Sequence, residues 1–344
     1  MKKYILSICT LAAICIGCVT VTWTPGIQAD AIVCTPSAAN SSAKTVTYTL
    51  TATDISSGSA TVTGLEPETS YRATLKLGEK TRGYSTFTTN LDLRDAIQLT
   101  PTDDWVTAIQ DAAAGSKFAL AAGEYTLTSA KLQINNNVTI AAQNSGNLPV
   151  INTCIHINNG SSLYLYQVVM DGTGTDGSQA IEYKTAGGFG DLIISSSTFY
   201  SCSAKRDILR ADDASSKVSA SMITSIDKCT FYNVGNGNAN YRFFYLRFPG
   251  NTNTFTNNVV ANFDNTRGFA NSTSVGVPSY SNNYYYNCKN LTSQAEGNTQ
   301  PNLTCFDTEG NILDKNPFAD PDNADFTITD ELFQSYGFGD PRWY

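Results

Sequence analysis

The sequence predicts an all-β protein in which a right-handed parallel β-helix follows a small β-sandwich. Four segments with aromatic centres can be superposed at spacings of 32, 24 and 30 residues: Thr198–Cys202, Thr230–Val234, Thr254–Asn258 and Tyr284–Cys288. A repeat of this length is typical of stacked coils, each of which buries its apolar face against its neighbours. Residues 20–90 instead contain short alternating runs separated by Gly, Pro and Ser, which indicates a sandwich.

The composition agrees with this fold class. Only 15% of the residues are charged, which leaves little material for long amphipathic helices, whereas abundant Asn, Thr, Ser, Gly and Tyr suit short strands joined by polar turns. The formal net charge is −8. Because a nucleic-acid-binding protein needs a strongly basic face, the composition argues against nucleic acid as a partner.

Residues 1–17 have the pattern of a secretory signal peptide. Lys2 and Lys3 precede an apolar run that is too short to span a membrane in the mature protein. The run ends in Cys15-Ile16-Gly17-Cys18, which resembles a bacterial lipobox, although Cys15 stands where an aliphatic residue is usual. The resemblance implies that Cys18 is the lipidated mature N-terminus of an outer-membrane lipoprotein, on the cell surface or the periplasmic face, with the lipid as its only membrane contact. The alternative is a soluble secreted protein.

The cysteines after Cys18 show no obvious pairing. If the coils are in register, Cys202 and Cys288 occupy equivalent positions three coils apart. At ~4.8 Å per coil their separation is about 14 Å, which is beyond the reach of a disulfide. Free thiols are therefore expected for this pair.

Residues 18–91 are expected to form the sandwich. The stretch Gly64–Tyr71 resembles the E-to-F corner of a fibronectin type III domain, with Tyr71 in the tyrosine-corner role and Trp23 as the core tryptophan of strand B. A chain that starts at Cys18 leaves hardly any room for strand A. The resemblance implies a role in spacing or presentation.

Residues 92–344 are expected to form the β-helix and a C-terminal cap. Asp103 to Ala114 predicts a short helix, capped by Thr102 or Asp103, that shields the open end of the coil. This helix and the strands after it, from Phe118, resemble the opening of pectate-lyase-like β-helices. About seven coils are expected up to roughly residue 295. The runs at 138–140, 163–165 and 192–194 are expected to continue the repeat upstream.

The whole arrangement resembles Bacteroidetes lipoproteins of polysaccharide-utilisation systems, in families described as domains of unknown function. The resemblance rests on the signal cysteine, the fibronectin-like unit, the coil and the ending Gly339-Asp340-Pro341-Arg342-Trp343. It implies glycan handling at the cell envelope, with other outer-membrane glycan-uptake proteins as further partners, and leaves the reaction open.

Charge is distributed unevenly along the predicted coil. Residues 203–267 contain eight cations against five acids, whereas residues 268–344 contain three cations against ten acids. The repeat places arginines along one flank, where like charges one coil apart repel unless an anion lies beside them. A uronate or sulfated polysaccharide would supply that anion. The predicted glycan-binding residues are Arg206, Arg210, Arg242, Tyr245, Arg247 and Arg267.

Aromatic residues beside these arginines are candidates for contact with sugar rings: Tyr241, Phe243, Phe244 and Phe248. The alternative is that the aromatic residues belong to the core and that the arginines extend over strands or pair with Asp207, Asp212 and Asp264.

A lyase is the second hypothesis. Elimination from a uronate requires its carboxylate to be neutralised, by Ca²⁺ or Arg, before a base removes the C5 proton. The candidate catalytic residues are Lys205, Arg210 and Arg247, and the candidate calcium ligands are Asp207, Asp212 and Asp213. Arg is a poor base, because its pKa lies above ~12. Hydrolysis of the polygalacturonase type would need a Gly-His-Gly segment that the sequence lacks, and the sole histidine, His156, is interpreted as structural.

The sequence thus predicts a cell-envelope lipoprotein that binds an acidic polysaccharide of the pectin or uronate type. A polysaccharide lyase that acts by β-elimination is the second function, and a non-catalytic structural or adhesive surface module is the third.

Overall fold

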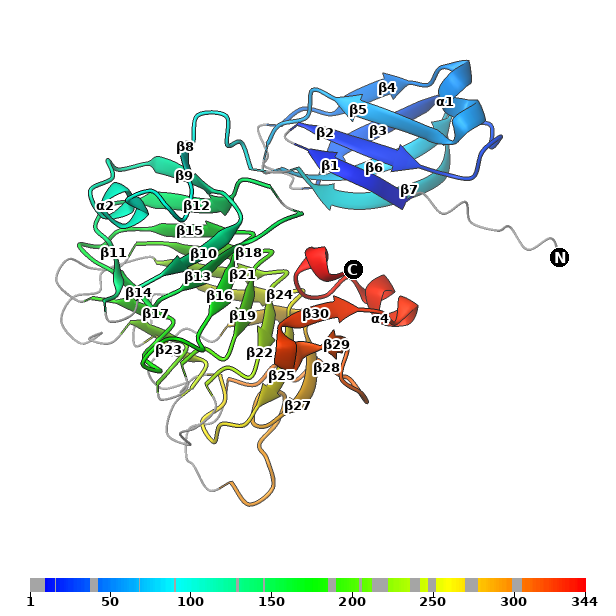
Figure 1. Ribbon diagram of the computed structural model, residues 1–344. Coiled ribbons are helices and arrows are strands. Elements are labelled where there is room, and N and C mark those ends of the chain that lie inside the picture. The colour runs from blue at the N-terminus through cyan, green and yellow to red at the C-terminus, as the bar shows by residue number, and fades with distance from the viewer. Residues whose placement is uncertain are drawn as a thin grey trace. The chain divides into compact units, whose positions relative to one another are not determined.

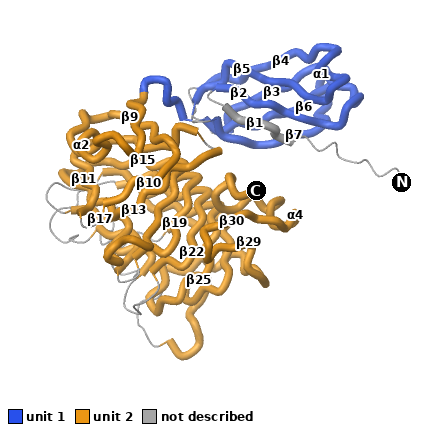
Figure 2. Tube along the Cα trace, in the orientation of Figure 1, with its two compact units in different colours: residues 1–95 blue, residues 96–344 orange. Residues whose placement is uncertain are grey.

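A computed structural model describes residues 10–15, 17–37, 43–67, 69–89, 91–127, 130–144, 146–184, 190–203, 206–211, 222–235, 242–246, 252–269, 278–298 and 305–344. The chain divides into two compact units, residues 1–95 and residues 96–344, which Figure 2 colours separately. The division lies four residues after the boundary expected at residue 91.

Unit 1 consists of two antiparallel sheets and one short helix (Figure 1). One sheet has the order β1 (Thr10–Cys15), β2 (Cys18–Thr22), β5 (Ser59–Thr63); the other has the order β4 (Val46–Thr49), β3 (Ala31–Pro36), β6 (Ser70–Leu77), β7 (Lys80–Thr88). Helix α1 (Ala52–Ser57) begins at a capping box formed by Thr51 and Asp54. Strand β1 consists of residues that the sequence analysis assigned to the signal peptide. Cys18, the predicted lipidation site, lies in β2 and is disulfide-bonded.

Alternation along the strands of unit 1 buries one side of each sheet. Val19 and Val21 of β2 face Ile32 of β3 in a single apolar core. Tyr71 is fully buried and its hydroxyl accepts a hydrogen bond from the Glu66 backbone N–H at 3.1 Å. This bond ties the chain before β6 to the core.

Unit 2 is a parallel β-solenoid of about six turns, close to the seven that the sequence predicts. Three sheets form its faces. Sheet I contains β8 (Ile97–Leu99), β9 (Ser116–Leu120), β12 (Val138–Ala142), β15 (Leu163–Tyr166), β18 (Leu192–Ser195), β21 (Ile223–Asp227), β24 (Thr252–Thr256) and β26 (Ser279–Ser281). Sheet II contains β10 (Gly123–Thr126), β13 (Pro149–Asn152), β16 (Val169–Asp171), β19 (Thr198–Tyr200), β22 (Thr230–Tyr232), β25 (Val259–Phe263), β27 (Tyr284–Cys288) and β28 (Asn311–Ile312). Sheet III contains β11 (Leu132–Ile134), β14 (Ile155–Ile157), β17 (Ile181–Tyr183), β20 (Leu209–Ala211) and β23 (Phe244–Leu246).

The turn from sheet I to sheet II repeats in successive coils. Its first residue has a positive φ in five consecutive turns, at Gln167, Ser196, Lys228, Asn257 and Asn282. Each of the first four donates its backbone N–H to a carbonyl of the next coil. Asn tolerates this left-handed conformation better than most residues, which explains part of the abundance of Asn in the later coils.

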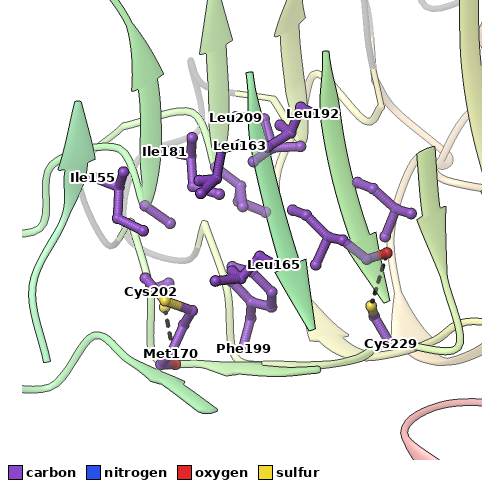
Figure 3. Close-up of a cluster of buried hydrophobic side chains, with 14 of the residues drawn as sticks. Ile155, Leu163, Leu165, Met170, Ile181, Leu192, Phe199, Cys202, Leu209 and Cys229 are labelled. Carbon is purple, nitrogen blue, oxygen red and sulfur yellow. Dashed lines mark hydrogen bonds between the residues drawn. The ribbon is translucent and has the colours of Figure 1, made fainter. Parts of the chain in front are cut away.

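The core of unit 2 lies inside the coil, where side chains from all three sheets meet (Figure 3). Aromatic side chains stack along the axis in the middle coils, and Phe199 and Phe231, which are in register, have ring centroids 5.1 Å apart. Cys202 and Cys288 are free thiols, as the sequence predicts, and so are Cys154 and Cys229.

The sequence repeat superposed four segments, but one of them, Thr254–Asn258, begins in a different sheet from the other three. Thr198 pairs with Thr230 in sheet II, but Thr230 pairs with Val259, and Val259 with Tyr284. Thr254 lies in sheet I, where it pairs with Ser225. The runs at 138–140, 163–165 and 192–194 also belong to sheet I and do not continue the sheet II series. Threonine and aromatic residues occur in both sheets, so composition alone could not tell the two strands apart.

The two ends of the coil are covered differently. Helix α2 (Trp105–Gln110), shorter than expected and capped by Asp104, buries Trp105 and Ile109 against the first coil. At the other end, Leu291 and Cys305 join the core, and the Tyr280 hydroxyl donates to the Cys305 carbonyl at 2.8 Å.

Residues 318–344, expected as a C-terminal cap, lie against the outer face of sheet II (Figure 1). They contain β29 (Phe318–Asp320), η1 (Pro321–Asn323), β30 (Asp325–Ile328), α4 (Glu331–Tyr336) and η2 (Pro341–Trp343). The buried carboxylate of Asp340 fixes their end, because it pairs with Arg342 and accepts a hydrogen bond from the Thr198 hydroxyl at 2.9 Å. In the described part of the chain, no helix has the length and apolar character needed to cross a bilayer.

Candidate functional site

The outer face of sheet III carries a column of polar side chains. Each strand of this sheet has three residues, and in the described strands the first and third are buried while the middle one faces outward. The strands are in register, so the middle residues lie one strand spacing apart, ~4.8 Å. In order along the coil they are Gln133, His156, Glu182, Arg210 and Tyr245.

The column begins with uncharged amides. The Asn158 side-chain amide donates to Gln133 Oε1 at 3.0 Å and to Asn135 Oδ1 at 2.9 Å. The Asn135 amide in turn donates to the carbonyl of Gln110, the last residue of α2. The first two coils therefore offer neutral hydrogen-bonding groups.

Glu182 is the centre of the column. One of its carboxylate oxygens lies 2.9 Å from Lys184 Nζ and 3.4 Å from His156 Nε2, and the other lies 3.9 Å from Arg210 Nε. Burial lowers the pKa of His156, and the nearby charge of Lys184 lowers it further. The negative charge of Glu182 opposes this shift, and the net lowering favours the neutral imidazole.

Guanidinium groups gather at the far end of the column. The Cζ atom of Arg210 lies 5.0 Å from the centroid of the Tyr245 ring, and that of Arg242 lies 4.3 Å from the same centroid. We call Arg210, Arg242, Arg267 and Tyr245 the arginine cluster. Arg242 is 8% exposed, so most of this charged residue is buried.

Arg267 joins the cluster from the next coil. The Phe243 backbone N–H donates to the Gly268 carbonyl at 2.9 Å, which brings Arg267 next to Arg242. Gly268 has a φ of +59°, and a Cβ there would lie 2.0 Å from the Asn290 carbonyl oxygen, so only glycine fits after Arg267. Burial lowers the pKa of Arg242; Asp207 raises it, and the charge of Arg267 lowers it further.

Asp207 is the buried counter-charge of the cluster. It is 2% exposed, accepts a hydrogen bond from the Arg242 backbone N–H at 2.8 Å, and has its other oxygen 3.7 Å from Arg210 Nη1. Burial raises its pKa against the opposing effect of this hydrogen bond and of both guanidiniums. One buried carboxylate therefore faces two guanidinium groups, those of Arg210 and Arg242.

The structure brings together some of the predicted site residues. Arg210, Arg242, Tyr245 and Arg267 are neighbours, whereas Arg206 is exposed and lies outside the contacts just described. Lys205, Asp212, Asp213 and Arg247, together with the aromatic candidates Tyr241 and Phe248, lie outside the described residues.

The arginines that the sequence repeat places along one flank of the coil are not in register with one another in the structure. Arg210 pairs with Tyr245, and Asp207 lies opposite Arg242, so the arginines do not repeat at one position of each coil. Phe243 and Phe244 were expected beside sugar rings but are buried in the coil, where their ring centroids are 4.9 Å apart. Loops of different length between the strands shift the register, and the sequence repeat did not reveal this shift.

Asp207 is the one proposed calcium ligand that lies within the described residues. Its carboxylate accepts a backbone N–H from Arg242 and lies 3.7 Å from Arg210 Nη1. Within the described ranges, no group of three or more His, Cys, Asp or Glu side chains could hold a metal ion.

Sequence reasoning missed Glu182 and Lys184 and interpreted His156 as structural. A signal was present, because His156, Glu182 and Arg210 each stand between two apolar residues, in Ile155–Ile157, Ile181–Tyr183 and Leu209–Ala211. These three-residue strands recur every 26 to 28 residues. Tripeptides of this kind are common in β-rich chains, so the pattern becomes informative only once the coils are stacked.

Comparison with known proteins gives one match. Searches of curated proteins and of solved structures found none. Residues 224–343 match a family model described as Domain of unknown function (DUF5123). The matched segment includes Arg242, Tyr245 and Arg267, and excludes His156, Glu182 and Arg210. The match therefore covers the last coils and the C-terminal segment of this solenoid.

Proposed function

We propose that this protein binds an acidic polysaccharide along the outer face of sheet III. The observation that carries the proposal is the arginine cluster, in which Arg210 and Arg242 lie over the Tyr245 ring and the charge of Arg267 acts on Arg242. The buried carboxylate Asp207 lies beside Arg210 and Arg242. Guanidinium groups at this spacing repel, and a bound anion relieves the repulsion.

The shape of the face supports a polymer as the ligand. The column runs across five strands, and its residue types change from amides at Gln133 to charged groups at Glu182 and Arg210. Amide side chains can bind sugar hydroxyls, while guanidiniums bind carboxylate or sulfate groups. An extended chain lying across the strands would meet both.

The test is retention on affinity gels that contain polygalacturonate, alginate or glycosaminoglycans. We expect retention that weakens with salt and with Arg210→Ala. Arg94→Ala is the matched control, because it removes the same charge from a side chain that is 75% exposed and lies outside sheet III. Retention on no gel would reject the proposal, as would retention that salt and Arg210→Ala leave unchanged.

β-Elimination is the second candidate function, favoured by the pair of His156 and Glu182. A neutral imidazole held by a carboxylate can accept a proton, and Arg210 lies two strands away in the same column to neutralise a uronate carboxylate. We expect the ultraviolet absorbance of unsaturated products from a uronate polymer with Ca²⁺, and none from His156→Gln. A panel of uronate polymers that gives no absorbance would reject the lyase.

We also propose that the protein is an exported lipoprotein, on the strength of Lys2, Lys3 and the lipobox-like ending at Cys18. Other outer-membrane glycan-uptake proteins are its proposed partners. Lipidation at Cys18 would remove β1 and compete with the disulfide of Cys18. The strand order of unit 1 and the Tyr71 hydrogen bond support a fibronectin type III-like unit, and the strong preference of parallel crossovers supports a right-handed coil.

A further inference from the structure

Among the described residues, the Nε–H groups of Arg242 and Arg267 in the arginine cluster have no hydrogen-bond partner, and both nitrogen atoms are buried. Arg242 as a whole is more than nine-tenths buried, and its guanidinium lies over the Tyr245 ring. Buried N–H groups are nearly always hydrogen-bonded in folded proteins, so a pair of orphans within one cluster indicates a missing acceptor.

The missing acceptor is anionic. Burial already lowers the pKa of Arg242, and the neighbouring charge of Arg267 lowers it further. The nearest carboxylate, Asp207, uses one oxygen for the Arg242 backbone N–H and turns the other toward Arg210. The described carboxylates therefore leave both Nε–H groups without an acceptor.

The arrangement of the donors indicates the geometry of the anion. A planar carboxylate has two oxygens in one plane and is matched by the fork of a single guanidinium. Here the guanidiniums come from separate coils, with Arg210 in β20, Arg242 just before β23 and Arg267 after β25. A tetrahedral sulfate ester presents three oxygens in different directions and can accept from several such donors at once.

We propose that the arginine cluster binds the sulfate ester group of a sulfated polysaccharide in preference to a uronate carboxylate. This inference rests on the proposed function, since it names the group that the same face recognises. The neutral amides at the start of the column and the cluster at its end then fit a polymer in which only some positions are sulfated.

The experiment compares two polymers that differ in sulfate alone: chondroitin sulfate, and the same polymer after chemical desulfation, which keeps its uronate carboxylates. Binding to the full chain is measured by calorimetry at fixed ionic strength. We expect at least about tenfold tighter binding of the sulfated polymer, which corresponds to ~1.4 kcal/mol. Arg267→Gln should remove this preference and leave the weaker binding of the desulfated polymer in place.

The matched control separates recognition from charge density, because a sulfated polymer carries more charge. Arg94→Gln removes one positive charge far along the sequence from sheet III and should preserve the preference. Arg267→Gln is used rather than Arg242→Gln because Arg267 is only half-buried and the variant is expected to fold.

Each outcome decides a different point. The sulfate assignment is wrong if the desulfated polymer binds as tightly as the sulfated one. It is also wrong if Arg94→Gln abolishes the preference as fully as Arg267→Gln. In both cases the proposal that the protein binds an acidic polysaccharide is retained. If neither polymer nor polygalacturonate binds, the proposed function fails as well. A preference that Arg267→Gln leaves intact would also overturn the assignment.

Discussion

Replacing Asp207 by Asn should tighten anion binding without lowering stability. Asn keeps an oxygen that can accept the Arg242 backbone N–H and removes the negative charge beneath the arginine cluster. An anion bound on the far side of a guanidinium would lie roughly 7 Å from Asp207. At an effective dielectric constant of about 20, the repulsion across that distance is about 2 kcal/mol. Allowing for solvent screening, we expect about tenfold tighter binding of chondroitin sulfate.

The effect on stability follows from the sign of the Asp207 pKa shift. Burial raises this pKa, so the folded protein disfavours the ionised carboxylate more than water does. The folded state therefore binds more protons than the unfolded state just above pH 3.8, and stability falls as the pH rises toward the folded pKa. Asn cannot ionise, so this dependence should disappear, and at pH 7 the variant should unfold at a urea concentration no lower than the wild type.

Calorimetric titration and urea unfolding check the two halves of this prediction. Asp191→Asn is the matched control, because Asp191 likewise accepts a backbone N–H, from Ile223 at 2.9 Å, and lies on the loop before β18. It should leave the affinity close to that of the wild type. Weaker binding by Asp207→Asn, or an equal gain from Asp191→Asn, would refute the view that Asp207 opposes the ligand at this site.

Three further predictions concern other parts of the molecule. Burial lowers the pKa of His156, and the charged residues that act on it are Glu182, Lys184, Lys131 and Asp176. The contribution of the neutral imidazole to stability should therefore be lost as the pH falls below about 6.5. Urea unfolding at several pH values should show this loss in the wild type and not in His156→Gln. Asp340→Ala, unlike Asp207→Asn, leaves no oxygen to accept the hydrogen bonds from Arg342 Nε and the Thr198 hydroxyl, so it should lower the free energy of unfolding by about 3 kcal/mol. Asp314→Ala at an exposed site should change it little. Mass spectrometry of protein from a bacterial envelope should find Cys18 as a lipid-modified N-terminus; a chain that retains residues 10–15 would instead match strand β1 as the structure has it.

The repeat in the sequence was enough to predict that unit 2 is a parallel coil. Its short apolar runs recur at the spacing of stacked turns, and a run can be buried only if another coil lies above or below it. The burial of Tyr71 and the helix that contains Trp105 were also readable, because a local motif signals each of them.

Which residues share a face of the coil could be read only from the folded chain. Side chains in a strand alternate with a period of two, so a change of one residue in loop length moves a side chain from the outer face to the core. This is why Tyr245, and no arginine, pairs with Arg210, why Phe243 and Phe244 are buried, and why Thr254 lies in sheet I. The contacts among His156, Glu182 and Arg210 arise only when three coils stack, because residues 26 to 28 apart in the chain then become neighbours one strand spacing apart.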